Sequence, residues 1–485
     1  MTKNVIIIGA GMAGLTTAAY LSRAGLKVDI YEQHTLPGGY ISSFVREGFT
    51  FPAGPTSITS NGIVFPILKE LGLAEKRRFL HVGHQMSWGE HDVPLENASQ
   101  VRDDLSKRFP VSIRELQRYF RWVEIGGGGF HHLVESGLMF GQSILPKMFN
   151  LLLHHPRFPW AALIARGQTN TSLHSRHFSD PELRHMLDEL AYPVMTAQNT
   201  LGMWISYFND TWAPAGGMQT FANTLVRFIR EQGGKVHLGT PVERIRVENG
   251  RATGITLADG TELSSTWVVS AADLRHTCIE LIGRTHLTPG LVAKLEAARP
   301  SEPAFTVFLG LRTSPELEIA FKRFHEPHVI FTCADGRTIQ VAWLSKDDAS
   351  IAPAGKHSLS VGWLDDYQDW EPLKGDPWAY QARKTAITDE LITRAEEFLP
   401  GLRAHIEVMD AASPLTYERY TSNWQGATTG WNWNPAHAPH FNLAKDLPLK
   451  SFYAVGHYTF NPGGVPTAMI TAWYIAREIL KSQPV

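Results

Sequence analysis

Residues 5–32 read VIIIGAGMAGLTTAAYLSRAGLKVDIYE, and this stretch decides the fold. It opens with four apolar residues, a run typical of a central parallel strand that is covered on both faces. A glycine turn follows, and residues 16–24 then read as a helix that ends at Gly25. A second strand is expected over 27–31, with Glu32 directly after it. This order predicts an α/β unit that binds a dinucleotide.

The glycines of this turn follow the pattern G-x-G-x-x-G. The first turns the chain, the second lets the backbone approach a pyrophosphate, and the third lets the helix pack closely on the strand. The free amides and positive dipole end of the helix would face the phosphates. Glu32 lies where an acid takes the ribose hydroxyls, which favours FAD or NAD over NADP. The cofactor-binding residues predicted in this unit are Gly9, Gly11, Met12, Ala13, Gly14, Glu32 and Gln33.

Composition sets broad limits. The 485 residues suggest about three domain-sized units or two interleaved domains. A content of 43% hydrophobic and 19% charged residues is that of a folded globular protein, and a net charge of −2 without a basic block gives no case for nucleic acid. Cys278 and Cys333 are the only cysteines, so no disulfide framework is expected and a reducing cytoplasm is the expected location. We expect neither a signal peptide nor a membrane-spanning helix.

A second glycine-rich segment follows the first unit, with LPGGYISSF at 36–44 and GFTFPAGPT at 48–56. This segment resembles the phytoene desaturase family, which includes carotenoid desaturases, carotenoid isomerases and retinol saturase within the amine-oxidase-like FAD flavoproteins. The resemblance implies FAD and adds cofactor-binding residues at Gly38, Gly39, Tyr40, Gly54, Pro55 and Thr56. The family usually has arginine at position 40, where it would help to hold the pyrophosphate, and often aspartate at 52, where this chain has proline.

The resemblance spans nearly the whole chain and implies an interleaved architecture. A Rossmann-type, glutathione-reductase-like FAD-binding domain is expected over 1–75, 212–290 and 445–485. An α+β substrate domain is expected over 76–211 and 291–444. Hydrophobic patterns predict a helix over 219–232 and strands over 235–238, 242–247, 251–257 and 262–271. Strands over 304–311, 329–344 and 357–364 suggest an antiparallel sheet, which a helix over 378–398 covers. By the resemblance Val242 lies against the adenine, whereas the alternative is a plain core residue.

Two features of the middle of the chain leave choices open. Residues 130–167 combine apolar helical segments with basic and aromatic residues, so they fit either a surface that enters a membrane or the wall of an apolar cavity. The run Gly126–Gly129 follows a helical stretch and not a strand. We interpret it as a flexible break between helices, so no second nucleotide-binding unit is expected.

The C-terminal stretch carries a second strong pattern, with a strand over 452–456, a loop, and a helix over 467–480. In the resembling family this helix begins at the flavin N1 and C2 carbonyl, where its dipole stabilises negative charge. The resemblance therefore adds Gly456, Gly464, Val465 and Thr467 to the cofactor-binding residues. His457, Tyr458 and Trp431 are candidate catalytic residues, although a structural histidine and core aromatics are the alternatives. Trp424, Trp431 and Trp433 are expected near an apolar substrate.

Other chemistries lack their motifs. The sequence has no P-loop, no G-x-S-x-G, no H-E-x-x-H and no clustered metal ligands. His131 with His132, His154 with His155, and His437 with His440 lack partners at ligand spacing, so no metal is expected.

The expected function is that of an FAD-dependent oxidoreductase acting on carbon–carbon bonds of a long apolar substrate, with desaturation of a carotenoid or other isoprenoid first. Saturation or cis–trans isomerisation of a polyene, amine oxidation, and a non-catalytic flavin-binding partner protein are the alternatives. The substrate, the electron acceptor or donor (quinone, oxygen or nicotinamide) and the oligomeric state stay open. A cytoplasmic protein, with peripheral contact to the inner face of a membrane as an open option, is expected.

Overall fold

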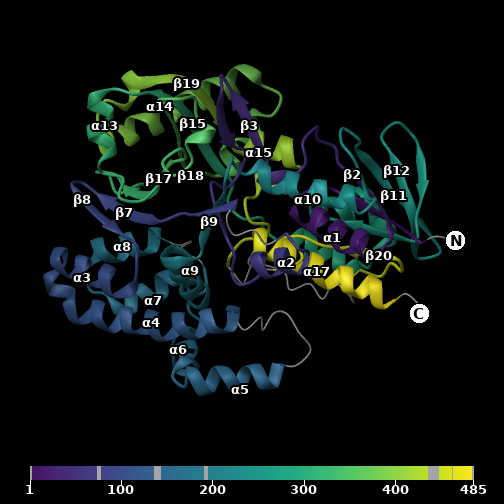
Figure 1. The fold of residues 1–485 in the computed structure, drawn as a ribbon, viewed down its shortest axis with the longest axis horizontal. Helices are drawn as coiled ribbons and strands as arrows, with labels where there is room; N and C mark the ends of the chain where they lie inside the picture. Colours follow the sequence, from purple (N-terminus) through teal and green to yellow (C-terminus); the bar gives the residue numbers. More distant parts are fainter. Residues whose placement is uncertain are drawn as a thin grey trace.

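The computed structural model describes residues 3–73, 78–135, 144–190, 195–434, 447–460 and 463–482. Figure 1 shows three groups of elements: a parallel sheet with its helices on the right, a large mostly antiparallel sheet at the upper left, and a group of helices at the lower left. Both chain termini lie beside the parallel sheet.

The parallel sheet collects strands from three separate parts of the chain. Its order is β10 (Lys235–His237), β2 (Lys27–Tyr31), β1 (Asn4–Ile8), β14 (Trp267–Ser270) and β20 (Phe452–Ala454), and every neighbouring pair is parallel. On one face pack α1 (Met12–Arg23), α10 (Gln219–Glu231) and α17 (Val465–Lys481), whose buried sides form an apolar core with the sheet. The other face packs against the small antiparallel sheet of β11 (Val242–Glu248), β12 (Arg251–Leu257) and β13 (Glu262–Ser264).

The single strand expected over 262–271 is wrong, because the chain forms two strands in different sheets. β13 pairs with β12, whereas β14 enters the parallel sheet beside β1. Between them the side chain of Asn4 accepts hydrogen bonds from the backbone N–H of Thr266, at 3.0 Å, and from its hydroxyl, at 3.3 Å. These local bonds turn the chain from one sheet into the other.

The large sheet has seven strands in the order β19 (Ile406–Ala412), β15 (Ala304–Arg312), β18 (Lys356–Leu364), β17 (Thr338–Trp343), β16 (His328–Thr332), β7 (His84–Trp88) and β8 (His91–Pro94). All neighbours are antiparallel except β16 and β7. One face buries alternate residues of these strands against α13 (Pro315–Phe321) and α14 (Pro377–Phe398). The 329–344 pattern is therefore a hairpin, β16 and β17, whose turn lies at Ala334–Gly336 as its sequence suggests.

Seven helices form the third group: α3 (Ala98–Arg108), α4 (Ile113–Glu135), α5 (Ile144–His154), α6 (Phe158–Ala165), α7 (Asn170–His177), α8 (Pro181–Glu189) and α9 (Ala197–Asn209). Side chains at Asn97, Thr169, Asp180 and Thr196 cap their N-termini by accepting backbone N–H groups. Most of these helices share one apolar core, into which Tyr119, Trp122 and Trp204 are fully buried.

The glycine run is not a flexible break, because α4 continues through Gly126–Gly129. A Cβ on Gly126 would lie 2.5 Å from the side chain of Leu201 on α9, and one on Gly129 would lie 2.1 Å from that of Phe158 on α6. Glycine is therefore needed here for close packing of helices. The prediction failed because tertiary packing outweighs the low helix propensity of glycine.

Shorter elements connect these groups. They are β3 (Ser43–Arg46) with β4 (Phe49–Pro52), the sheet of β5 (Ile58–Thr59), β9 (Thr211–Pro214) and β6 (Phe79–His81), and the helices α2 (Val64–Glu70), α11 (Leu274–His276), α12 (Pro289–Ala297) and α15 (Pro414–Thr421). Cys278 and Cys333 are both buried and free. Within the described ranges, the helices are all too short or too polar to cross a membrane.

Candidate functional site

One large cavity lies where the three groups of elements meet, with a volume of ≈ 1530 Å³. Gly9, Glu32, Ala271 and Gly456 line it, and each follows the carboxyl end of a strand of the parallel sheet. Ligands of such sheets bind at this edge. The volume exceeds the roughly 300–1,000 Å³ of a pocket for one drug-sized ligand. The cavity therefore has room for a dinucleotide together with a substrate.

The three glycines of the first turn occupy different positions relative to the cavity. A Cβ on Gly14 would lie 2.0 Å from the carbonyl oxygen of Gly9, so this position holds α1 against the end of β1. A Cβ on Gly11 would meet no described atom within 4 Å, and Gly11 lines the cavity. The space above Gly11 and the N-terminus of α1 therefore fits a pyrophosphate.

Glu32 lines the cavity beside this turn. One carboxylate oxygen accepts the backbone N–H of Ala10 at 2.7 Å, and the other accepts that of His34 at 2.8 Å. Its side chain thus ties the first turn to the end of β2 while one edge faces the cavity. The side-chain amide of the next residue, Gln33, donates a hydrogen bond to the hydroxyl of Ser422 at 2.8 Å.

The second glycine segment folds over the first. The backbone N–H of Gly38 donates to Ala10 at 2.8 Å, and a Cβ on Gly54 would lie 2.5 Å from the carbonyl oxygen of Tyr40. Tyr40, which stands where the resembling family has arginine, donates its hydroxyl to the carbonyl oxygens of Gly426 and Ala427, both at 3.0 Å. Burial raises the pKa of Tyr40, so the side chain is neutral and brings no positive charge to a phosphate.

The N-terminus of α17 closes the cavity from the other side. Gly464, with φ +134°, precedes the helix, and Val465 and Thr467 in its first turn line the cavity. Gly463 packs so closely that a Cβ there would lie 1.7 Å from the carbonyl oxygen of Thr429. The free amides of this helix therefore face the cavity, as those of α1 do.

The predicted cofactor-binding residues almost all meet at this cavity. Those that line it are Gly9, Gly11, Met12, Ala13, Glu32, Gln33, Gly38, Gly39, Tyr40, Gly54, Pro55, Thr56, Val242, Gly456, Gly464, Val465 and Thr467. Gly14 lies behind them in the packing of helix on strand. Their individual contacts to a cofactor stay predictions.

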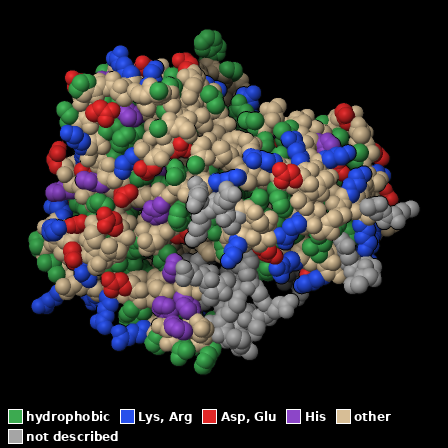
Figure 2. Space-filling view, viewed as in Figure 1, with side chains coloured by type: hydrophobic (Ala, Val, Ile, Leu, Met, Phe, Trp, Pro, Cys, Tyr) green, Lys and Arg blue, Asp and Glu red, His purple; other side chains and the backbone are tan. Residues whose placement is uncertain are grey.

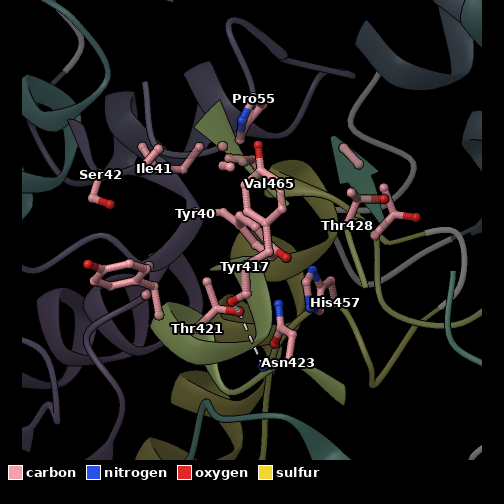
Figure 3. Close-up of a pocket in the computed structure, with 18 of the residues that line it drawn as sticks. Tyr40, Ile41, Ser42, Pro55, Tyr417, Thr421, Asn423, Thr428, His457 and Val465 are labelled. Atoms are coloured by element: carbon pink, nitrogen blue, oxygen red, sulfur yellow. Dashed lines mark hydrogen bonds between the residues drawn. The ribbon is translucent and has the colours of Figure 1, made fainter. Parts of the chain in front are cut away.

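The three catalytic candidates differ in their access to the cavity. His457 lines it between Thr428 and the loop of Asn423 (Figure 3), and burial lowers its pKa to about 4. The imidazole is therefore neutral near pH 7. Tyr458 also lines the cavity but is 2% exposed, and burial followed by the charge of Asp273 raises its pKa well above the ordinary value.

Trp431 is 1% exposed and lies outside the lining. Its indole N–H donates to the carbonyl oxygen of Tyr458 at 2.7 Å, and its ring packs edge-on against that of Tyr458 with centroids 5.0 Å apart. This geometry fits a positioning residue for the 456–458 loop. Of the other two tryptophans expected near the substrate, Trp433 lines the cavity and Trp424 does not.

The wall opposite the parallel sheet is the second face of the large sheet. The strand β15 alternates, with Phe305, Val307 and Leu309 in the apolar core and with Ala304, Thr306 and Phe308 at the cavity. Neighbouring strands add Ser360, Gly362 and Ala342 to the same wall. Apart from Phe308, the side chains named on this face are small, and they leave the volume of the cavity open. The period-2 alternation of 304–309 could have indicated these residues from sequence.

Two further groups were not predicted. The helix α9 presents Asn199, Gly202, Met203 and Ser206 to the cavity at the spacing of one helical face. Tyr417 on α15 faces it too and donates its hydroxyl to Thr306 at 2.9 Å (Figure 3). A helix of this mixed composition gives no sequence pattern that separates a cavity face from a core face.

Metal chemistry has no ligand set here: within the parts of the chain that the structure covers, no three His, Cys, Asp or Glu side chains group as a metal site would require. His437 and His440 lie outside the described residues. The two helix N-termini, the open space over Gly11 and the carboxylate of Glu32 together fit a dinucleotide such as FAD.

The sequence is similar to those of known proteins over nearly its whole length. The model of the family of flavin-containing amine oxidoreductases matches residues 12–480. A 4,4'-diapophytoene desaturase (4,4'-diapolycopene-forming) of Methylomonas sp is 27% identical, with 99% of this chain and 95% of that protein covered. A 4,4'-diaponeurosporene oxygenase of Staphylococcus aureus (strain MW2) is 24% identical, with 99% and 98% covered.

Solved structures share the fold over the full length. An oxidoreductase from Methanosarcina mazei has a TM-score of 0.63 at 17% identity. The match covers 98% of this chain and 100% of the chain of that oxidoreductase. Putrescine oxidase bound to putrescine has a TM-score of 0.64 at 14% identity, with 99% of both chains covered.

Proposed function

The chain belongs to the family of flavin-containing amine oxidoreductases and is an FAD-dependent oxidoreductase, and we propose that its substrate is a carotenoid or other long isoprenoid that it desaturates. The observation that carries the substrate class is the full-length similarity to a diapophytoene desaturase and a diaponeurosporene oxygenase. The cavity supports it, because small side chains of its second wall, such as those of Ala304 and Ala342, leave room next to the predicted cofactor residues.

The cofactor domain of this proposal is of Rossmann type and glutathione-reductase-like, and comprises residues 1–75, 212–290 and 445–485. The parallel sheet and the helices α1, α10 and α17 support these boundaries, because all of their residues fall within the three segments. The substrate domain comprises 76–211 and 291–444. It contains the seven-stranded sheet and the helices α3 to α9.

The residues of the chain divide the work as follows. Bound FAD supplies the chemistry of hydride acceptance from a carbon atom. Glu32 and the turn around Gly11 hold the adenosine and pyrophosphate, and the first turn of α17 provides amides at the flavin end. The apolar wall excludes water from the reacting bond. His457 is uncharged near pH 7, so it can accept but not donate a proton at its bare nitrogen.

Product analysis tests this proposal. The holoenzyme is incubated with an acyclic isoprenoid that contains saturated bonds between its double bonds. One sample contains oxygen or a quinone to reoxidise the flavin, another contains a reduced nicotinamide to reduce it, and the products are separated by chromatography. We expect products that have lost two hydrogens per step and absorb at longer wavelength. Recovery of a product that gained hydrogens, or only a geometric isomer, would instead favour the saturase or isomerase alternative.

A variant pair links the activity to the cavity. Met203 on α9 lines the cavity, so Met203→Glu would place a carboxylate against the apolar substrate and lower turnover at least tenfold while FAD stays bound. Gln198 lies on the same helix but is exposed outside the lining, so Gln198→Glu is the matched control and should act like the parent. Equal activity in both variants would contradict this position of the substrate.

We further propose that α5 and α6 contact a membrane surface, from which an apolar substrate can enter. The exposed fractions are 70% for Phe149, 65% for Leu153, 51% for Trp160 and 66% for Leu163. Figure 2 shows green side chains at the lower edge of the molecule, beside a group of histidines. Exposed apolar side chains on neighbouring helices are typical of an interfacial surface. The two free cysteines are consistent with a reducing compartment. A cytoplasmic location stays a prediction.

A further inference from the structure

Two histidines, His84 and His328, lie side by side at the part of the cavity lined by the large sheet and α9. They are direct neighbours on the parallel strands β7 and β16. Their rings meet edge to face with centroids 5.0 Å apart, and the ring of His84 lies 4.8 Å from that of Tyr207 on α9. Strand register therefore fixes the pair in one place on the cavity wall.

The pair is buried and incompletely bonded. His84 is 8% exposed, and its Nδ1 has no hydrogen-bond partner among the described residues. Leaving such a buried nitrogen without a hydrogen-bond partner is unfavourable. Two polar side chains of α9 near the wall are engaged elsewhere: Ser206 donates to the carbonyl oxygen of Gly202 at 3.0 Å, and Tyr207 donates to that of Leu190 at 2.6 Å. The unpaired nitrogen therefore points to a partner supplied by a ligand.

The chemistry of the pair limits the kind of group that fits. The lining residues that come from β7, β16, β17 and α9 include no charged side chain in the described parts of these elements. Burial lowers the pKa of His328 to about 4. Burial together with His328 and His81 lowers the pKa of His84 well below its ordinary value, and a contact with the backbone of Val82 opposes this shift only in part. Two neutral imidazoles offer both an N–H donor and a bare nitrogen acceptor. A neutral hydroxyl, which donates and accepts, matches both, whereas a carboxylate would lack a counter-charge.

We propose that His84 and His328 form a subsite that hydrogen-bonds a terminal hydroxyl group of the polyene substrate. The proposal rests on the proposed function and deepens it, because it assigns a hydroxylated polyene as the preferred substrate. A hydrocarbon end in the same place would cover the unpaired nitrogen without bonding it. A site built to bond a hydroxyl discriminates against the analogue that lacks it.

The test compares two ligands on the holoenzyme: an acyclic polyene hydrocarbon, and the same polyene with a hydroxyl at one end. Binding is followed by the shift of the polyene absorption. We expect the parent to bind the alcohol at least tenfold more tightly than the hydrocarbon. His84→Leu and His328→Leu should abolish that preference, mainly by weaker binding of the alcohol. The control His286→Leu, at an exposed histidine outside the cavity, should keep the preference.

The outcomes separate the subsite from the proposed function. Binding of neither polyene would overturn the proposed function itself. Equal binding of both polyenes to the parent would overturn the subsite alone, as would an unchanged preference in both leucine variants. The preference for the alcohol is measured first on the parent protein. The subsite can therefore be tested even if a variant loses FAD. His84→Gln, which retains hydrogen-bonding groups, should keep part of the preference if the variant folds.

Discussion

The glycines of the first turn differ in the space that is available for a Cβ atom, although all of them are part of the same motif. Gly14 has a backbone oxygen 2.0 Å from the position of a Cβ, whereas Gly11 has open cavity. Gly14→Ala should therefore destabilise the protein by several kcal/mol, because a backbone oxygen cannot move aside cheaply. Gly11→Val should fold but lose FAD. Flavin absorbance per protein, and thermal unfolding of the apoprotein, measure the two effects.

Two results would contradict the predictions for Gly11 and Gly14. A Gly11→Val protein that keeps the parent's FAD content would show that the pyrophosphate does not lie above Gly11. A Gly14→Ala protein with the parent's melting temperature would contradict the close packing of α1 on β1.

His457 gives a pH prediction whose sign follows from its pKa of about 4 in the folded protein. An unfolded histidine titrates near 6.5. Between these values the unfolded chain binds a proton that the native protein does not, so the free energy of unfolding falls as pH is lowered from 6.5 to 4. His457→Gln should flatten this decline. Urea unfolding of parent and variant at several pH values measures it, and identical declines would contradict the buried, neutral histidine.

The same histidine gives a kinetic expectation. Because His457 is neutral throughout pH 6–8, its titration should cause no rise or fall of the turnover rate with pH in this range. His457→Gln should retain FAD while the turnover rate changes. An unchanged turnover would remove His457 from the catalytic residues.

At this scale the sequence predicts which residues of the first unit lie together at the cavity, because their positions follow from local backbone geometry. Glycines 9 to 14 and Glu32 lie within one β-α-β unit, so their relative positions follow from strand and helix alone. His84 and His328 could not be paired from sequence. They are 244 residues apart, and only the parallel register of β7 and β16 brings them together.

Elements show how packing overrides local propensity. In α4, Gly126 and Gly129 face the side chains of Leu201 and Phe158, whereas a Cβ on Gly127 would lie 3.5 Å from the nearest atom, in Ile205. Gly129→Ala should therefore lower the melting temperature, because Phe158 must shift. Gly127→Ala is the matched control and should leave it unchanged or raise it, since alanine favours the helix by up to about 1 kcal/mol. A lower melting temperature in both variants would contradict this packing.

The boundaries of most elements could be predicted because their patterns are strong. The strand over 27–31 and the helix over 219–232 match β2 and α10 to within one residue. The exceptions are places where long-range contacts decide, such as the division between β13 and β14 and the passage of α4 through four glycines. A single sequence carries no record of those contacts.

At the scale of the whole molecule, α5 and α6 carry exposed apolar side chains that the described core does not bury. Replacing Phe149, Leu153, Trp160 and Leu163 by serine should reduce cosedimentation with lipid vesicles at least fivefold and leave FAD content unchanged. The control replaces Val111 and Trp378, which are 93% and 89% exposed elsewhere in the sequence, by serine. Equal loss of vesicle binding in both proteins would show that general surface hydrophobicity, and not the α5–α6 surface, determines membrane contact.

Reduction of the flavin by its substrate can be followed in the absorption spectrum of the purified protein under anaerobic conditions, as an isoprenoid and, separately, an amine are added. We expect an oxidised flavin spectrum that bleaches on addition of the isoprenoid and not of the amine. Bleaching by amines alone would move the chain to amine oxidation. A purified protein without any flavin would contradict FAD binding, including the dinucleotide site predicted from the first glycine turn.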